Sequence, residues 1–118
     1  MTAYNLKNII DGVQLTNAVA TYYTTPDNTR CELRKLSFTN TSAAAVTVTV
    51  YIVPSGGTAS DANTIKKTKA LAPAGFGSDT WNCIEALGHC LNAGETVQAV
   101  CSANTSVSVR GTGLEIVG

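Results

Sequence analysis

Apolar and polar residues alternate one for one along much of this chain, and this pattern says more about its secondary structure than any other. It is clearest in residues 46–52, which read Val-Thr-Val-Thr-Val-Tyr-Ile. Successive side chains of a strand point to opposite faces, so the four aliphatic side chains of this segment share one face. The pattern therefore predicts a half-buried β-strand.

Similar alternation, rich in β-branched residues, recurs along the sequence and predicts about eight short strands. Besides 46–52, the predicted strands are residues 13–23, 32–38, 64–71, 80–86, 97–101, 107–109 and 114–116. The phase slips at Arg34 and Lys35, which predicts a bulge or an edge. Pro, Gly, Asn and Asp cluster between the strands and predict turns. These turns are at 25–28, 54–57, 72–75, 92–94 and 111–113.

Many short strands separated by turns predict an all-β chain, a single antiparallel β-sandwich or jelly roll. Its 118 residues are enough for one domain with one core. The predicted core is Leu33, Leu36, Phe38, Val46, Val48, Val50, Ile52, Ile84, Val97, Val107, Val109, Leu114 and Ile116.

The N-terminal segment, residues 1–20, lacks a steady period and stands apart from the predicted sandwich domain, residues 21–118. Two interpretations remain open. The segment is a first strand packed on the domain, or it is an arm that becomes ordered only on a partner. An arm would place Leu6, Ile9 and Ile10 in pockets of a neighbouring subunit.

The charge of the chain is low and balanced. Charged residues make up 14% of the sequence, and eight Lys and Arg offset eight Asp and Glu. No long-range field would attract nucleic acid or an anionic membrane, so we expect neither partner. A net charge near zero favours contact with other protein surfaces. The start of the sequence has no apolar run typical of a secretory signal, and we expect a cytoplasmic chain.

Residues that could support catalysis or bind a metal are few. In a cytoplasmic chain we expect Cys31, Cys83, Cys90 and Cys101 to be free thiols. Metal binding by Cys83, His89 and Cys90 does not fit the usual spacing of structural zinc ligands, and we expect no metal and no cofactor. An enzyme would have to use a dyad of Cys90 and His89, whose side chains diverge on a strand. We therefore expect a protein that is not an enzyme.

Two aromatic features suggest binding surfaces. Phe76 lies between two glycines in a predicted loop, where its ring either anchors a protein interface or folds back onto the core. Tyr22, Tyr23 and Trp81 are the aromatic residues that could form a glycan-binding face. The candidate interface residues are Leu6, Ile9, Ile10, Phe76 and Trp81.

Several segments resemble small β-sandwich virion proteins of tailed bacteriophages. They are residues 38–57, 70–73, 91–99 and 113–116, and the resemblance extends over about residues 30 to 117. It implies a capsid decoration (cement) subunit, often a homotrimer, or a related tail component. Its partners would be the major capsid protein or other virion proteins, and its location would be the virion, assembled in the host cytoplasm. Residues 74–81 depart from the family pattern, because a longer Gly-Phe-Gly-Ser-Asp stretch replaces a short turn.

The function expected first is therefore a structural virion protein that stabilises a phage head through non-covalent contacts. The alternative is a tail or fibre module that binds a cell-surface glycan or another tail protein. The sequence leaves head or tail location, oligomeric state and the contacting loops open.

Overall fold

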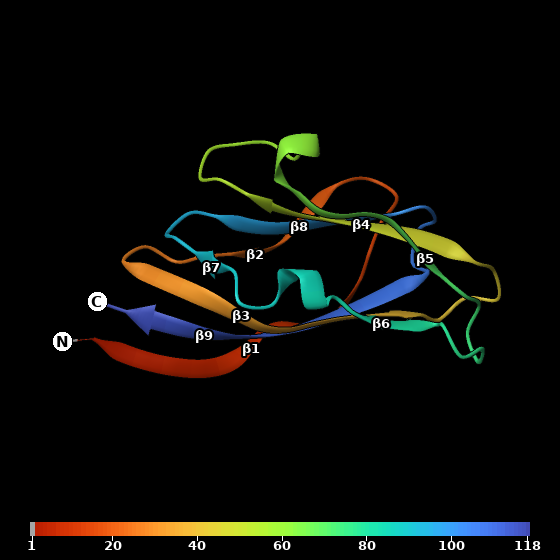
Figure 1. Ribbon diagram of the computed structural model, residues 1–118, viewed down its shortest axis with the longest axis horizontal. Coiled ribbons are helices and arrows are strands. Elements are labelled where there is room, and N and C mark those ends of the chain that lie inside the picture. The colour runs from red at the N-terminus through yellow and green to blue at the C-terminus, as the bar shows by residue number, and fades with distance from the viewer. Residues whose placement is uncertain (1) are drawn as a thin grey trace.

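Two antiparallel β-sheets packed face to face make up the computed structural model, which describes residues 2–118 (Figure 1). This confirms the all-β sandwich expected from the alternation. The first sheet has the order β1-β9-β3-β6, with β7 also paired to β3. Its strands are β1 (Ala3–Gln14), β3 (Thr29–Asn40), β6 (Thr80–Asn82), β7 (Cys90–Leu91) and β9 (Val107–Val117).

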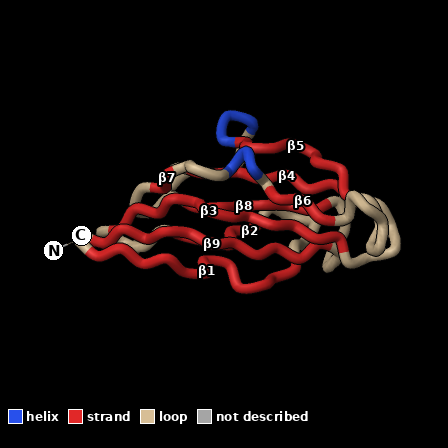
Figure 2. The backbone as a smooth tube through the Cα atoms, turned by 60° about the horizontal axis from the view of Figure 1, so that its bottom comes forward, coloured by secondary structure: helices blue, strands red, loops and turns tan. Residues whose placement is uncertain are grey.

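The second sheet has the order β2-β8-β4-β5. Its strands are β2 (Ala20–Thr24), β4 (Val46–Val53), β5 (Thr64–Leu71) and β8 (Thr96–Cys101), and two single-turn 3₁₀ helices are η1 (Asp61–Asn63) and η2 (Ile84–Ala86). The sandwich is elongated, measuring 49 × 26 × 20 Å. Both termini lie at one end of the long axis (Figures 1 and 2). No helix in residues 2–118 is long and apolar enough to cross a membrane.

The core lies between the two sheets and contains most of the residues expected there. The expected residues that are buried are Leu33, Leu36, Phe38, Val46, Val48, Val50, Val97, Val107 and Val109, and Ile52 packs against them half-buried. The rings of Phe38 and Trp81 stack with their centroids 5.3 Å apart. Alternation predicts these core residues correctly because each of these strands presents one face to the opposite sheet.

The C-terminal strand corrects the prediction most clearly. The expected turn at residues 111–113 does not form, and β9 runs without interruption, paired to β1 on one side and β3 on the other. The alternation of inward and outward side chains therefore continues past Val109 without interruption. Glu115 faces the core, whereas Leu114 and Ile116, predicted to be core residues, lie half-buried on the outer face.

Two glycines lie inside β9 because their neighbours need the space that a side chain would occupy. A Cβ at Gly113 would stand 2.6 Å from the Sγ of Cys31, and one at Gly111 would stand 3.3 Å from a methyl of Leu36. These glycines thus provide close packing between strands and not the reversal expected from their usual role.

Two further differences concern the bounds of strands. The predicted strand 13–23 is divided between β1 and β2, because Leu15 turns into the core and its amide donates to the carbonyl of Val107. The predicted strand 80–86 ends early at β6. The chain then enters η2, which leaves Ile84, expected in the core, 69% exposed.

Residues 3–14 form a strand of the first sheet. β1 is paired in antiparallel register with β9 from Ala3 opposite Val117 to Gln14 opposite Ser108. The slip expected at Arg34 and Lys35 is present as a register shift between Leu33 and Lys35 of β3. β1 has two such shifts, between Asn8 and Ile10 and between Asp11 and Val13, and its register is regular only over residues 3–8.

Candidate interaction surface

Large apolar side chains cover the outer face of the first sheet near the chain termini. In the register, Tyr4 is opposite Ile116 and Leu6 is opposite Leu114. Tyr4 and Leu6 are 67% and 66% exposed, and the two β9 side chains are half-buried. We call these four residues the outer stripe. Outward-facing strand positions are usually polar, so an uncovered apolar row marks a surface that gains free energy when a partner covers it.

Polar and basic groups occupy the part of the outer face beyond the stripe. A pocket of about 190 Å³ is lined there by Asn8, Lys35, Ser37, Arg110, Gly111 and Thr112. Within residues 2–118, neither Lys35 nor Arg110 forms an ion pair. The pocket therefore offers two cations and several hydroxyl or amide groups to a carboxylate of a partner.

The inner face beneath the stripe holds a buried polar cluster. Tyr23 of β2 donates its hydroxyl to Oε2 of Glu115 at 2.6 Å, which joins the two sheets. Lys7 places its Nζ 3.5 Å from Oε1 of the same carboxylate. Burial raises the pKa of Tyr23 strongly, and the hydrogen bond to Glu115 adds to the rise. The cluster is a structural bridge, because a tyrosine held protonated acts as a hydrogen-bond donor over the ordinary pH range.

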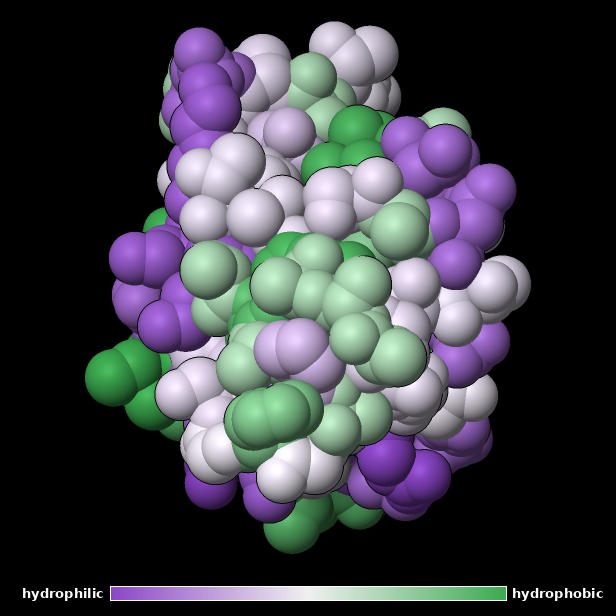
Figure 3. All heavy atoms as spheres, turned by 90° about the vertical axis from the view of Figure 1, so that its right-hand side faces the viewer, coloured by the Kyte–Doolittle hydropathy of each residue, from purple (hydrophilic) through white to green (hydrophobic). Residues whose placement is uncertain are grey.

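A second apolar surface lies at the opposite end of the sandwich from the termini. Residues 41–45 and 72–79 form adjacent loops there, joined by a 2.8 Å bond from the amide of Ala74 to the carbonyl of Ser42. Buried Asn40 fixes both loops, since its Nδ2 donates to the carbonyls of Ala44 and Ala72. Phe76 is 64% exposed in this region. Figure 3 shows apolar side chains gathered over this end, with polar groups around them. We call it the apolar tip; its exposed members are Ala43, Ala44, Ala45, Ala74 and Phe76.

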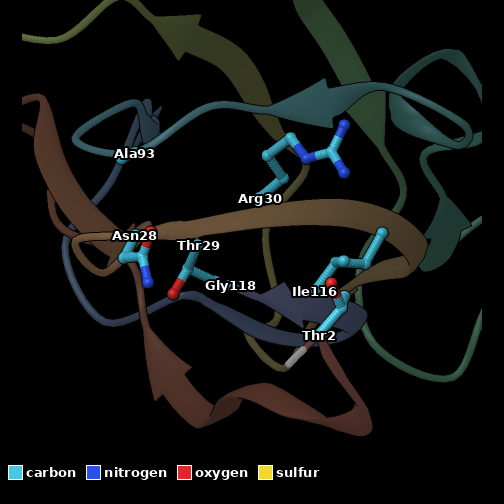
Figure 4. A pocket seen from close by; sticks show the side chains of 7 residues that line it. All are labelled: Thr2, Asn28, Thr29, Arg30, Ala93, Ile116 and Gly118. Atoms are coloured by element: carbon cyan, nitrogen blue, oxygen red, sulfur yellow. The ribbon is translucent and has the colours of Figure 1, made fainter.

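A further pocket, of about 290 Å³, lies near the termini. It is lined by Thr2, Asn28, Thr29, Arg30, Ala93, Ile116 and Gly118. Figure 4 shows these side chains around the start of β3 and the end of β9. Arg30 is the one ionisable side chain of this lining.

The structure separates the five interface candidates into three groups. Leu6 and Phe76 are exposed, on the outer stripe and the apolar tip. Ile9 is half-buried, and Ile10 and Trp81 lie in the core. Ile10 turns inward after the first register shift of β1, and Trp81 is held by Phe38 on one side and by Lys69, whose Nζ is 5.9 Å from its ring. These two side chains are therefore unavailable to a partner.

The aromatic face considered for a glycan is not present as an exposed platform. Tyr23 and Trp81 are core residues, and Tyr22 packs half-buried against the core. A sugar ring stacks on an open aromatic face, and burial removes that face from solvent.

The thiols and the histidine are also dispersed. Cys31, Cys83 and Cys101 are buried, and Cys90 is exposed on β7. Burial raises the pKa of Cys83 to about 11, which lowers its reactivity. Across residues 2–118 no three His, Cys, Asp or Glu side chains form a group that could hold a metal ion. In the same residues, no hydrogen bond joins the His89 ring to a thiol or a carboxylate.

Sequence reasoning missed three of the four residues of the outer stripe. Residues 1–20 alternate too irregularly to predict which face Tyr4 occupies, and the turn predicted at residues 111–113 places Leu114 and Ile116 in the core. The signal that could have found them is the phase of Val107 and Val109. If the alternation that puts residues 107 and 109 inward continues through residues 111 and 113, residue 115 points inward and residues 114 and 116 point outward.

Comparison with known proteins establishes the kind of fold. No protein-family model and no curated protein matches this sequence. Among solved structures, the chain is similar to a protein of Bacillus endospore appendages, described as forming disulfide-linked pili, with a TM-score of 0.55 and 11% identity. That match covers 99% of this chain and 90% of the other.

A second similar structure is a chain of infectious bursal disease virus, Gx strain, with a TM-score of 0.52 and 14% identity. The match covers 98% of this chain and 32% of the viral one, so this chain spans about a third of the viral chain. At such identities the likeness shows a shared β-sandwich fold.

Proposed function

We propose that this chain is a structural subunit of a larger protein assembly, and that the assembly is the head of a tailed bacteriophage, on which the chain acts as a decoration subunit. One observation carries the proposal. Large apolar side chains, Tyr4, Leu6 and Phe76, remain exposed on two surfaces that the chain itself does not cover.

The two surfaces suit two kinds of contact. The outer stripe lies along β1 at the side of the sandwich, and the apolar tip lies at one end of its long axis (Figures 1 and 3). In this proposal the tip contacts the capsid surface, and the stripe contacts other copies of the chain. Fully covering a Phe or Leu side chain contributes about 1.5–3 kcal/mol, so identical contacts repeated over a particle add up to a large stabilisation.

The similar structures support the assembly role, since one is a pilus protein and the other belongs to a virus particle. The proposal that the assembly is a phage head rests on the sequence resemblance of residues 38–57 and the three shorter segments.

The test of this proposal uses purified phage heads that lack their decoration protein. We expect the chain to bind these heads and to raise the temperature at which they release DNA. Phe76→Ser should weaken binding about 10-fold or more, because it removes the largest apolar group of the tip.

Ile84→Ser is the matched control, because Ile84 is equally exposed but lies on η2, away from the tip. If neither wild type nor variant binds heads, the decoration role is wrong. If the two variants weaken binding equally, the tip is not the contact. The mass of the free protein gives the copy number: a mass of three chains would support the homotrimer implied by the resemblance, and a mass of two chains would replace it with a dimer.

A further inference from the structure

The outer edge of β1 is open. β1 is the terminal strand of the first sheet and is paired only with β9, so within residues 2–118 the backbone groups on its other side meet no strand. Figure 2 shows this strand along the lower border of the sheet. Unpaired N–H and C=O groups along a strand form a template for a strand from another chain.

The other sheet edges are short or protected. β6 and β7 contain three and two residues, and β2 contains five with a register shift. β5 is longer, but it carries Lys66, Lys67 and Lys69, and Thr68 interrupts it with a φ of 48°. Charge and irregularity of this kind discourage pairing between chains. Residues 3–8 of β1 contain one charge, Lys7, and no register shift, and so form the longest regular open edge.

An antiparallel copy of residues 3–8 fits this edge. A two-fold axis perpendicular to the sheet keeps the same face of both strands outward. Even-numbered residues of one copy must then lie opposite even-numbered residues of the other, and odd-numbered residues opposite odd-numbered ones. With the axis at Asn5, Tyr4 lies opposite Leu6 of the second copy, and Lys7 lies opposite Ala3. Aromatic–aliphatic pairs of this kind stabilise a sheet, and the register keeps the two lysines apart.

This register also leaves the existing contacts of β1 in place. Lys7 retains Glu115 on the inner face, and Tyr4 and Leu6 retain their β9 partners on the outer face. The outer stripes of both copies become one continuous apolar surface across the joined sheets.

We propose that two copies of this chain pair antiparallel through residues 3–8 of β1, with the two-fold axis at Asn5, to form one continuous sheet. The inference rests on the proposed function, because it names a second copy as the partner of the β1 edge that borders the outer stripe. It predicts a two-fold contact, and the assembly then contains dimers as a unit.

Cross-linking tests the register directly. In a Cys90→Ser background, which removes the exposed thiol, Asn5→Cys places the two new thiols opposite each other at the axis. Mild oxidation should then convert most of the protein to a covalent dimer. Ala3→Cys and Val19→Cys are exposed controls away from the axis and should give little dimer. A maximum at another β1 position would overturn the register, and equal cross-linking at every site, or none at Asn5, would overturn the pairing.

A charge exchange tests the same pairing without oxidation. Ala3→Lys puts like charges opposite each other at two symmetric places, and we expect the dimer dissociation constant to rise about 10-fold. Ala3→Glu puts opposite charges there and should lower the constant. Both variants keep an exposed side chain at the same place, so their melting temperatures should match. Equal dissociation constants for the two would contradict the inference.

Hydrogen exchange on the unaltered protein gives an independent readout. Amides of residues 3–8 should gain protection as the protein concentration rises, while those of β5 should not. A protein that remains a monomer yet binds phage heads would overturn this inference and leave the proposed function standing. A dimer through β1 that binds no head would support this inference and overturn the proposed function.

Discussion

Glu115 is a carboxylate on the inner face of a β-sandwich, where a charged group is stable only if neighbouring atoms replace the water it has lost. The hydroxyl of Tyr23 supplies one bond at 2.6 Å, and Lys7 supplies a compensating charge at 3.5 Å. Because Lys7 is half-exposed, solvent screens its contribution. The hydrogen bond from Tyr23 is therefore the stronger support of this carboxylate.

Tyr23→Phe should lower the free energy of unfolding by about 1.5–3 kcal/mol, since it removes a donor from a buried charge and leaves the ring in place. Lys7→Gln should cost less than about 1 kcal/mol, as expected for a screened pair. Urea unfolding followed by circular dichroism measures both. An equal loss in the two variants would contradict this ranking.

Alkaline pH should weaken the fold at another buried residue, Cys83. Burial raises its pKa from 9.0 to about 11 in the folded state. The folded state then holds the proton more tightly than the unfolded state. The stabilisation is complete below pH 9 and is lost as the pH rises through 11. The loss attributable to Cys83 is about 2–3 kcal/mol. The free energy of unfolding, measured from pH 8 to 11, should fall less steeply with pH for Cys83→Ala than for the wild type. Parallel curves for the two proteins would show that Cys83 is not the source of the loss.

At the scale of elements, β9 determines how the molecule is organised. It is the central strand between β1 and β3, and its continuous phase directs Glu115 inward and the apolar Leu114 and Ile116 outward. The strand can lie this close to β3 only because Gly113 leaves room for the Sγ of Cys31. One small residue therefore supports the pairing that exposes the outer stripe.

Gly113→Ala should destabilise the fold by about 1–3 kcal/mol, because the added Cβ would stand 2.6 Å from the Cys31 sulfur. Adding Cys31→Ala removes that sulfur, and the double variant should lose less stability than the sum of the single changes. Gly77→Ala is the control, since its Cβ would meet no atom within 4 Å. Strict additivity of the two substitutions would show that the sulfur is not the obstacle.

The whole molecule is an elongated sandwich with no net charge and with apolar surfaces at two separate places. Net charge near zero removes the long-range repulsion that keeps many small proteins apart. The outer stripe and the apolar tip are far from each other along the chain and face different directions, so one subunit can contact two partners simultaneously (Figures 1 and 3).

Small-angle scattering should detect association at this scale. The Cα radius of gyration of one chain is 14.1 Å. At rising concentration the wild-type protein should exceed this value and approach twice the single-chain mass. Leu6→Lys should stay near the single-chain values, because it replaces an apolar group of the stripe by a charge. A wild type that keeps the mass of one chain at every concentration would contradict the association.

Much of the fold was accessible from local pattern. Residues 46–52, 64–71 and 97–101 were each predicted as strands, and each corresponds to one strand of the second sheet. The slip at Arg34 and Lys35 was visible as a break in alternation. These features depend on neighbours along the chain, which is why the sequence displays them.

The sequence by itself determined the β-sandwich class and most of the core, because the period of alternation is a local property. Only the tertiary structure decided that Gly111 and Gly113 belong to a strand, since their role is to admit side chains from β1 and β3. That choice sets the phase of residues 114–116 and, with it, which face is apolar. The candidate surface could not be predicted, because it depends on contacts between strands that are remote in the chain. A turn at residues 111–113 is predicted from the glycines alone, without those contacts.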